Sequence, residues 1–174
     1  MSENKKVPLA QLATNVLEDC TGMIKNSGKW PAVFDANDRA SVFIKYRGAN
    51  VVDARNSDQL KPDRLLLALL GAIKVGNVLV IDMAGCELWD HVEKCFDDVE
   101  QGLLRNLLSK KIFENEGFMD LITEEVEKQP GFDKKQFRQT AVVCGAAEKF
   151  TFMIVSRTDN RVGIWKDMFG IDIE

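Results

Sequence analysis

Histidine is almost absent from the chain, which has one, His91, among 174 residues. A serine or cysteine nucleophile needs a nearby base and a group that orients that base, and one histidine completes no such arrangement here. His91 lies among charged residues in a segment with helical spacing, so we expect a solvated helix position. The acidic stretch 93–100 lacks the glycine and the spacing of a calcium-binding loop. The sequence therefore argues against a hydrolytic triad and against a calcium site.

Cysteine occurs four times, but never with the Cys-x-x-Cys spacing of zinc sites. The four residues are Cys20, Cys86, Cys95 and Cys144, and all of them fall within apolar segments. This placement predicts reduced, buried thiols and no disulfide or zinc framework.

An excess of positive charge is also missing, since the formal net charge is −4. This value argues against nucleic acid or an anionic membrane as the partner. The longest apolar runs, Leu65–Ile73 and Val78–Ile81, are too short to cross a bilayer. No apolar segment follows Met1–Lys6, so no secretory signal is visible. We therefore expect a cytoplasmic protein.

Strands that alternate with helices are the main pattern present. The length and the hydrophobic fraction of 45% predict one domain with a real core. The continuous apolar runs Val78–Asp82 and Phe150–Ser156 are typical of central strands in a parallel sheet. Further predicted strands are Ala32–Phe34, Asn50–Asp53 and Gly170–Ile173, and predicted helices are Arg39–Tyr46, Pro62–Lys74 and 88–109 with a break near Gly102. This alternation predicts an α/β fold with a mostly parallel sheet.

Two other regions give further predictions. Residues 1–8 are polar and are expected to be loose. Leu9–Lys25 carries apolar residues at helical spacing, which predicts a helix that ends before Gly28. Within residues 110–148 we expect a short helix over Phe118–Val126, a loop at Pro130-Gly131 and a strand over Ala141–Cys144.

Polar side chains stand where the predicted strands end. Asp35, Asp53, Asp82 and Ser156 occupy these positions. Because ligands of parallel α/β sheets bind at the carboxyl ends of the strands, these residues mark the candidate site.

Two segments resemble nucleotide-binding motifs but lack essential residues. Five residues, not four, separate Gly22 from Gly28, and Trp30 stands where a Walker A loop has Ser or Thr. That loop also leads from a helix into a strand, the reverse of a P-loop. Val78–Asp82 has the form of a Walker B strand, but Met83 follows where an AAA hydrolase has a glutamate that polarises water. We therefore expect no catalysis.

The segment Lys29–Lys45 resembles the fifth AAA module of dynein heavy chains. That family has Arg-Trp-Pro, an apolar strand ending in Asp, then Pro-Gln-Gly-Gln-Ala and Trp-Ile-Lys. Leu69–Ile81 is similar to its helix, glycine turn and Walker B strand, and Lys149–Arg157 resembles its Phe-Arg-Leu strand. The resemblance covers about residues 28–173. Phe43–Ala54 is more similar to the dynein-motor-like C-terminal part of IQ-motif and ankyrin-repeat proteins.

The resemblance implies a P-loop NTPase-like fold, a three-layer sandwich with an AAA core and a mostly parallel sheet. It divides the chain into an N-terminal tail and helix, 1–27, and a degenerate AAA-like α/β domain, 28–174. The helical lid of AAA modules is not expected, because the sequence ends at Glu174. The phosphate loop would fall at Asp35–Arg39, where two aspartates replace the glycines and the lysine of a phosphate cradle.

A vestigial nucleotide site is therefore expected, made of Asp35, Asn37, Arg39, Asp82 and Ser156, with no metal site and no cofactor. The resemblance implies a non-catalytic interaction or scaffold module that binds a protein partner in a cytoskeletal or ciliary setting. The alternative is an atypical site in which Asp82, Ser156 and Arg39 bind ATP or ADP with Mg²⁺ weakly, or hydrolyse it.

Overall fold

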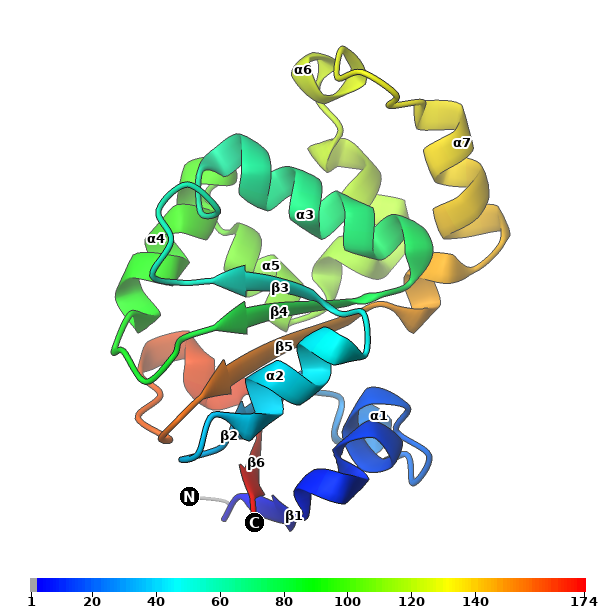
Figure 1. The fold of residues 1–174 in the computed structure, drawn as a ribbon. Coiled ribbons are helices and arrows are strands. Elements are labelled where there is room, and N and C mark those ends of the chain that lie inside the picture. Colours follow the sequence, from blue (N-terminus) through cyan, green and yellow to red (C-terminus); the bar gives the residue numbers. More distant parts are fainter. Residues whose placement is uncertain (1–2) are drawn as a thin grey trace.

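Six parallel strands form one sheet in the computed structural model, which describes residues 3–174 (Figure 1). Their order across the sheet is β1-β6-β2-β5-β4-β3. The strands are β1 (Lys5–Val7), β2 (Pro31–Phe34), β3 (Asn50–Asp53), β4 (Val78–Asp82), β5 (Thr151–Ser156) and β6 (Phe169–Ile173). The predicted α/β class with a parallel sheet is confirmed, and so are five of the six strands expected from the sequence.

The middle strands are covered on both faces, as their continuous apolar sequences predict. All four residues of β2 are buried. Val33 pairs with Val155 of β5 and with Ile171 of β6. Because successive side chains of a strand point to opposite faces, Phe34 belongs to one hydrophobic core and Val33 to the other.

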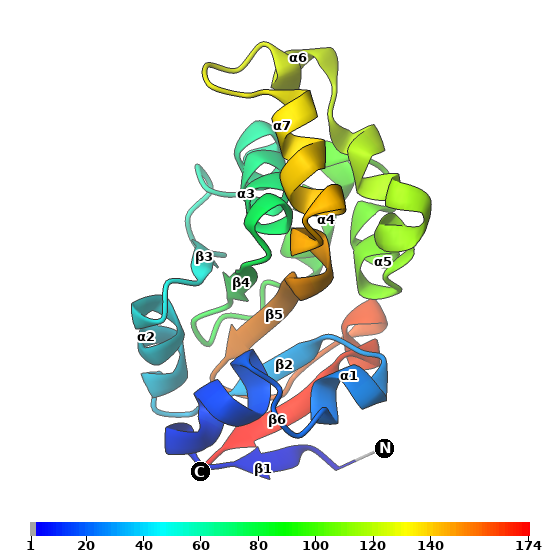
Figure 2. The same cartoon turned by 90° about the vertical axis from the view of Figure 1, so that its right-hand side faces the viewer.

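Helices lie on both faces of the sheet (Figure 2). The face that carries Phe34 packs against α3, α4 and α5, and the face that carries Val33 packs against α1 and α2. No helix among residues 3–174 is both long and apolar enough to cross a membrane. The helices are α1 (Met23–Ser27), α2 (Arg39–Tyr46), α3 (Pro62–Val75), α4 (Trp89–Val99), α5 (Leu103–Leu108), α6 (Glu124–Glu127) and α7 (Lys134–Arg138).

The predicted break near Gly102 separates α4 from α5, because Gly102 adopts a positive φ of 80°. The chain also forms 3₁₀ segments at Leu9–Gln11, Lys111–Leu121, Ala146–Lys149 and Gly163–Asp167. The segment Lys111–Leu121 is kinked at Glu114, Asn115 and Glu116. A helix over Phe118–Val126 is therefore only partly correct, since the turn that ends at Leu121 is separate from α6.

The N-terminal segment differs from its prediction in two ways. The residues expected to be loose include β1, which pairs with β6 and extends the sheet. The continuous helix Leu9–Lys25 is also wrong: a helical stretch ends at Leu17, and α1 begins only at Met23. Asp19 has a φ of 47°, and its carboxylate accepts the backbone N–H groups of Ile24 and Lys25 at 3.0 and 2.8 Å. This turn interrupts the predicted helix, although Leu12, Val16 and Ile24 on its two sides are buried in the same core.

The strand predicted over Ala141–Cys144 is wrong as well. Residues Gln139–Val143 are helical and continue from α7. Phe137 and Ala141 are buried, whereas Val143 is 60% exposed. Burial at positions four apart is the pattern of a helix. Only the side of the helix that carries Phe137 and Ala141 therefore contacts the core.

Trp30 immediately precedes β2, and its side chain packs at the amino end of that strand. It is 8% exposed, and its indole N–H donates a hydrogen bond to the carbonyl of Leu107 at 2.7 Å. Phe113 and Phe150 meet its ring edge-on, with ring centroids 6.1 and 5.7 Å away. Trp30 therefore joins the sheet to the segment after α5, in a structural position.

We expect Trp30→Ala to lower the free energy of unfolding by about 3–5 kcal/mol, the usual range for emptying a buried aromatic site. Trp30→Phe is the matched control, because it keeps an aromatic ring and loses only the N–H donor. Its expected loss is about 1–3 kcal/mol, from the unpaired carbonyl of Leu107. Urea unfolding of the three proteins measures both values. A loss below about 1 kcal/mol for Trp30→Ala would contradict the structural role.

Candidate functional site

The carboxyl ends of β2, β4 and β5 meet at one edge of the sheet and bring the predicted residues together. The backbone N–H of Asp35 donates to the carbonyl of Ser156 at 2.9 Å. The N–H of Met83, next to Asp82, donates to the carbonyl of Val155 at 2.8 Å. Asp35, Asp82 and Ser156 therefore end three adjacent strands, as the sequence predicts.

The carboxylate of Asp35 is buried at the start of α2, where it is 2% exposed. One of its oxygens accepts the backbone N–H of Asn37 at 3.0 Å, and the other accepts that of Ala40 at 2.8 Å. The Arg39 guanidinium lies 3.7 Å from the same carboxylate. Free N–H groups at a helix start are what a phosphate binds. Here a side chain of the protein already occupies those donors.

The carboxylate of Asp82 also accepts two hydrogen bonds from within the protein. One carboxylate oxygen accepts the hydroxyl of Ser41, and the other accepts the backbone N–H of Ala84 at 2.8 Å. The sequence patterns do not single out Ser41, although it stands in the first turn of the helix that follows the candidate loop. The Ser41 hydroxyl and the Asp82 carboxylate therefore satisfy each other within the protein.

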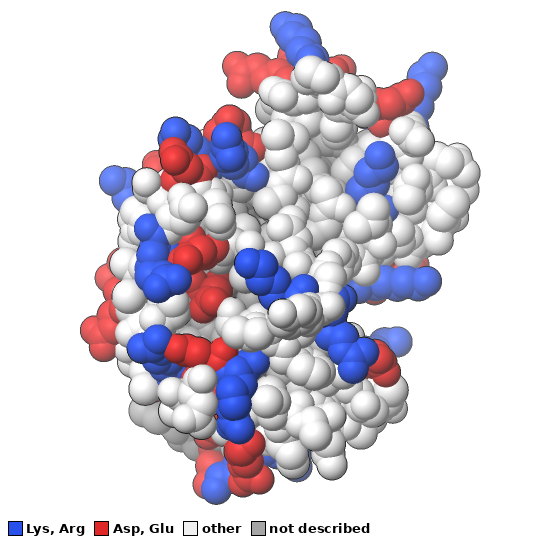
Figure 3. Space-filling model, in the orientation of Figure 1, with Lys and Arg blue, Asp and Glu red and all other residues white. Residues whose placement is uncertain are grey.

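Two ion pairs surround these residues. Arg157, which follows β5, donates from Nε to the carboxylate of Asp38 at 2.6 Å, and this contact raises the pKa of Arg157. Arg55 forms two bonds of 2.9 and 2.8 Å to Asp53, and its hydrogen bond holds the pKa of that carboxyl below its ordinary value. Acidic and basic side chains are accordingly interspersed along the side to which the arrows of β3, β4 and β5 point (Figure 3).

The other expected residues contribute less. The side chain of Asn37 is exposed, and only its backbone N–H contacts the site. Ser156 is 3% exposed and contributes its carbonyl. Met83 is fully buried in the core with α3 and α4, so its side chain belongs to that core.

Cysteine and histidine give no metal site within residues 3–174, where no group of three or more metal-ligand side chains is found. The expected burial of the cysteines is wrong for three of them: Cys20, Cys86 and Cys144 are exposed, and only Cys95 is buried. Cys20 and Cys86 lie in turns, so the apolar residues next to them do not predict their burial. His91 is exposed on α4, as predicted.

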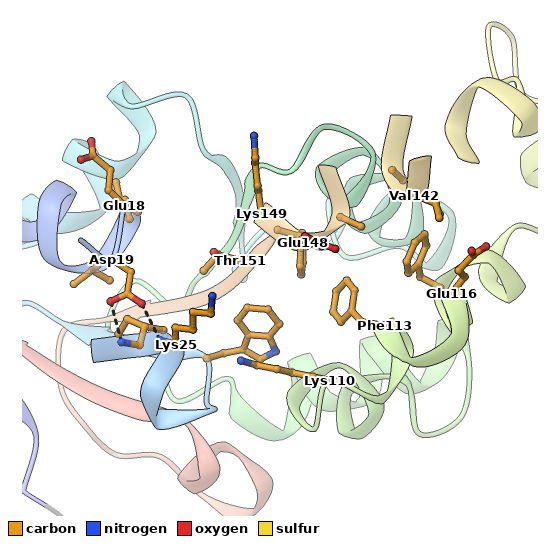
Figure 4. A pocket seen from close by; sticks show the side chains of 18 residues that line it. Glu18, Asp19, Lys25, Lys110, Phe113, Glu116, Val142, Glu148, Lys149 and Thr151 are labelled. Carbon is orange, nitrogen blue, oxygen red and sulfur yellow. Dashed lines mark hydrogen bonds between the residues drawn. The ribbon is translucent and has the colours of Figure 1, made fainter. Parts of the chain in front are cut away.

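A cavity of about 790 Å³ lies at the opposite edge of the sheet, near the amino ends of β2 and β5 (Figure 4). It is lined by the segments 16–25, 110–118 and 141–151 and by Trp30. None of the site residues predicted from the sequence lines it. Its walls come from three distant segments, so no sequence motif indicates it.

No family model matches the chain, and no solved structure matches it. What can be said of the site therefore depends on its own geometry.

Asp35→Ala tests whether the carboxylate occupies an anion site. We expect its loss to lower the free energy of unfolding by about 1 kcal/mol, similar to the loss of a capping side chain, because Asp35 also accepts a backbone N–H of the first helical turn. The freed N–H groups of Asn37 and Ala40 should then bind inorganic phosphate, so that phosphate raises the melting temperature of Asp35→Ala more than that of the wild type.

The matched control is Asp98→Ala, which removes the same charge from an exposed position of α4. Phosphate also stabilises proteins non-specifically, and this control shows how much of the rise has that cause. An equal rise in all three proteins, measured by differential scanning calorimetry, would show that Asp35 covers no anion site.

Proposed function

We propose that the chain is a non-catalytic protein-interaction module on a P-loop-like α/β core, whose former nucleotide site is occupied by its own side chains. The observation that carries this proposal is the buried carboxylate of Asp35, which binds the N–H groups of Asn37 and Ala40. A nucleotide phosphate would have to displace this carboxylate, and nothing else on the loop offers a compensating lysine or glycine.

The contact between Ser41 and Asp82 supports a P-loop-like origin of the core. In P-loop NTPases a hydroxyl at the start of the helix and the acid that ends the Walker B strand hold Mg²⁺ together. Ser41 and Asp82 come from the same two places and bond directly to each other. With Met83 buried next to Asp82, no carboxylate takes the place of the catalytic glutamate.

The cellular environment that we propose comes from the resemblance to the fifth AAA module of dynein heavy chains. It covers most of the chain from Lys29 onward, and it favours a degenerate AAA module that binds protein in a cytoskeletal or ciliary environment. The AAA and dynein assignments depend on this resemblance alone, whereas the absence of catalysis depends on the contacts of Asp35 and Asp82.

We assign the partner to the exposed side of α2. Val42 and Tyr46 are 55% and 88% exposed and lie four residues apart, hence on one side of the helix. Ala40 and Ile44 are buried on the other side. Tyrosine is enriched at interface centres. The exposed basic residues Lys45 and Arg47 next to Tyr46 favour a partner surface with an apolar centre and acidic groups around it.

Calorimetric titration tests the absence of nucleotide chemistry. We expect no binding heat with ATP, ADP or GTP in the presence of Mg²⁺, and turnover below about 0.1 per second, since productive NTPases reach about 1–100 per second. Mg²⁺ should raise the melting temperature of neither the wild type nor Asp82→Asn, because a metal bound to the native state alone would stabilise it. A Mg²⁺-dependent rise, or turnover removed by Asp82→Asn, would establish the alternative nucleotide-binding function.

Site-specific photocrosslinking in cells tests the partner surface. A benzoylphenylalanine at position 46 should give adducts of defined mass, whereas the same residue at position 125, on exposed α6, should not. Val42→Asp should abolish the adducts at position 46 while leaving the melting temperature within about 2 °C of the wild type, because the side chain is exposed. Adducts that are the same at both positions, or that persist in Val42→Asp, would contradict the assignment. Identification of cytoskeletal proteins among them would support the proposed setting.

A further inference from the structure

The cavity at the amino edge of the sheet has the size of a ligand site. Its volume of about 790 Å³ lies within the range of about 300–1,000 Å³ that small-molecule pockets occupy. Its floor is aromatic: Trp30, Phe113 and Phe150 all line it and contact one another edge-on or tilted. The indole N–H of Trp30 is already bonded to Leu107, so the floor offers the cavity an apolar surface.

Two lysines from separate walls lie at one end of this cavity. In the view of Figure 4, Lys25, from α1, and Lys110, from the turn after α5, lie toward the end that also carries Glu18 and Asp19, while Glu116 and Val142 lie at the other end. The ammonium of Lys110 lies 4.3 Å from the centre of the Trp30 ring. Burial lowers the pKa of Lys110. Among residues 3–174, no carboxylate forms an ion pair with either lysine.

The acidic residues of the lining are mostly occupied elsewhere. Asp19 accepts two backbone N–H groups of α1. Glu116 receives two hydrogen bonds from Arg138, at 3.1 and 3.0 Å. Glu18 is exposed and accepts a weak bond from the Cys20 thiol at 3.7 Å. Only Glu148 lacks a polar partner among the described residues. No acidic side chain among residues 3–174 forms an ion pair with Lys25, Lys110 or Lys149, the third lysine of the lining, so their ammonium groups have no carboxylate partner there.

We propose that this cavity binds a small organic anion with a flat, apolar body. The flat part would lie on the aromatic floor, and the anionic group, a carboxylate, sulfonate or phosphate, would pair with Lys25 and Lys110. A partly dehydrated ammonium without a carboxylate gains more from such a pair than a fully solvated one. This site is separate from the nucleotide-like edge and does not depend on the function proposed for it.

A matched pair of fluorescent probes tests the proposal. Anilinonaphthalene sulfonate is an aromatic anion, and phenylnaphthylamine has the same ring system without the sulfonate. We expect the wild type to bind the anion at least about tenfold more tightly than the neutral probe. Lys110→Met keeps most of the side-chain volume and should weaken binding of the anion about tenfold without changing that of the neutral probe. Lys111→Met, at an exposed position outside the lining, should change neither.

Because the anionic probe also binds partly unfolded proteins, each variant must show the cooperative melting of the wild type. If Lys110→Met melts early, Lys25→Met replaces it, since Lys25 is exposed and its loss leaves the core intact. Equal affinity of the two probes, unchanged binding in both lysine variants, or no binding of the anion would each overturn the proposal.

Discussion

The carboxylate of Asp35 is the group on which the candidate site depends. A buried charge is costly unless hydrogen bonds replace its hydration, and Asp35 receives two from the backbone at the start of α2. The same N–H groups are then satisfied without a ligand, and the partial positive charge of the helix start is neutralised by the protein itself. The loop therefore needs no bound anion to satisfy these two N–H groups. A phosphate-binding loop differs, because its N–H groups converge on an anion that the protein does not supply.

The surrounding ion pairs contribute less to the stability of the loop around Asp35. Arg157–Asp38 and Arg55–Asp53 are largely exposed, and pairs of that kind stabilise proteins little. Their loss would leave the Asp35 carboxylate on its donors and the Ser41 hydroxyl on Asp82. Under the proposed function, two hydrogen-bonded aspartates at strand ends account for the loss of nucleotide binding, and the exposed charges mainly determine the electrostatic character of the surface around them.

The parts of the fold that the sequence predicts are those decided by burial over consecutive residues. β4 and β5 are continuous apolar runs, and α3 has a proline at its first turn and Gly76 at its end, so local pattern and tertiary position agree. β1 could not be found in this way, because Lys5 and Lys6 are polar and the strand forms only where β6 offers an unpaired edge. The turn at Asp19 likewise depends on a side chain that bonds to backbone groups, and hydrophobic periodicity carries no information on such bonds.

Prediction from the sequence has the same limit for the candidate site residues at the two edges of the sheet. Asp35, Asp82 and Ser156 could be predicted because parallel strands bring their carboxyl ends together, so position along each strand determines proximity. Ser41 and Lys25 belong to helices and Lys110 to a turn, and their partners are set by how those elements pack. At the carboxyl edge every buried polar group is paired within the protein. At the amino edge, among the described residues, Lys25 and Lys110 have no carboxylate partner, and these are the charged groups that an anionic ligand would pair with.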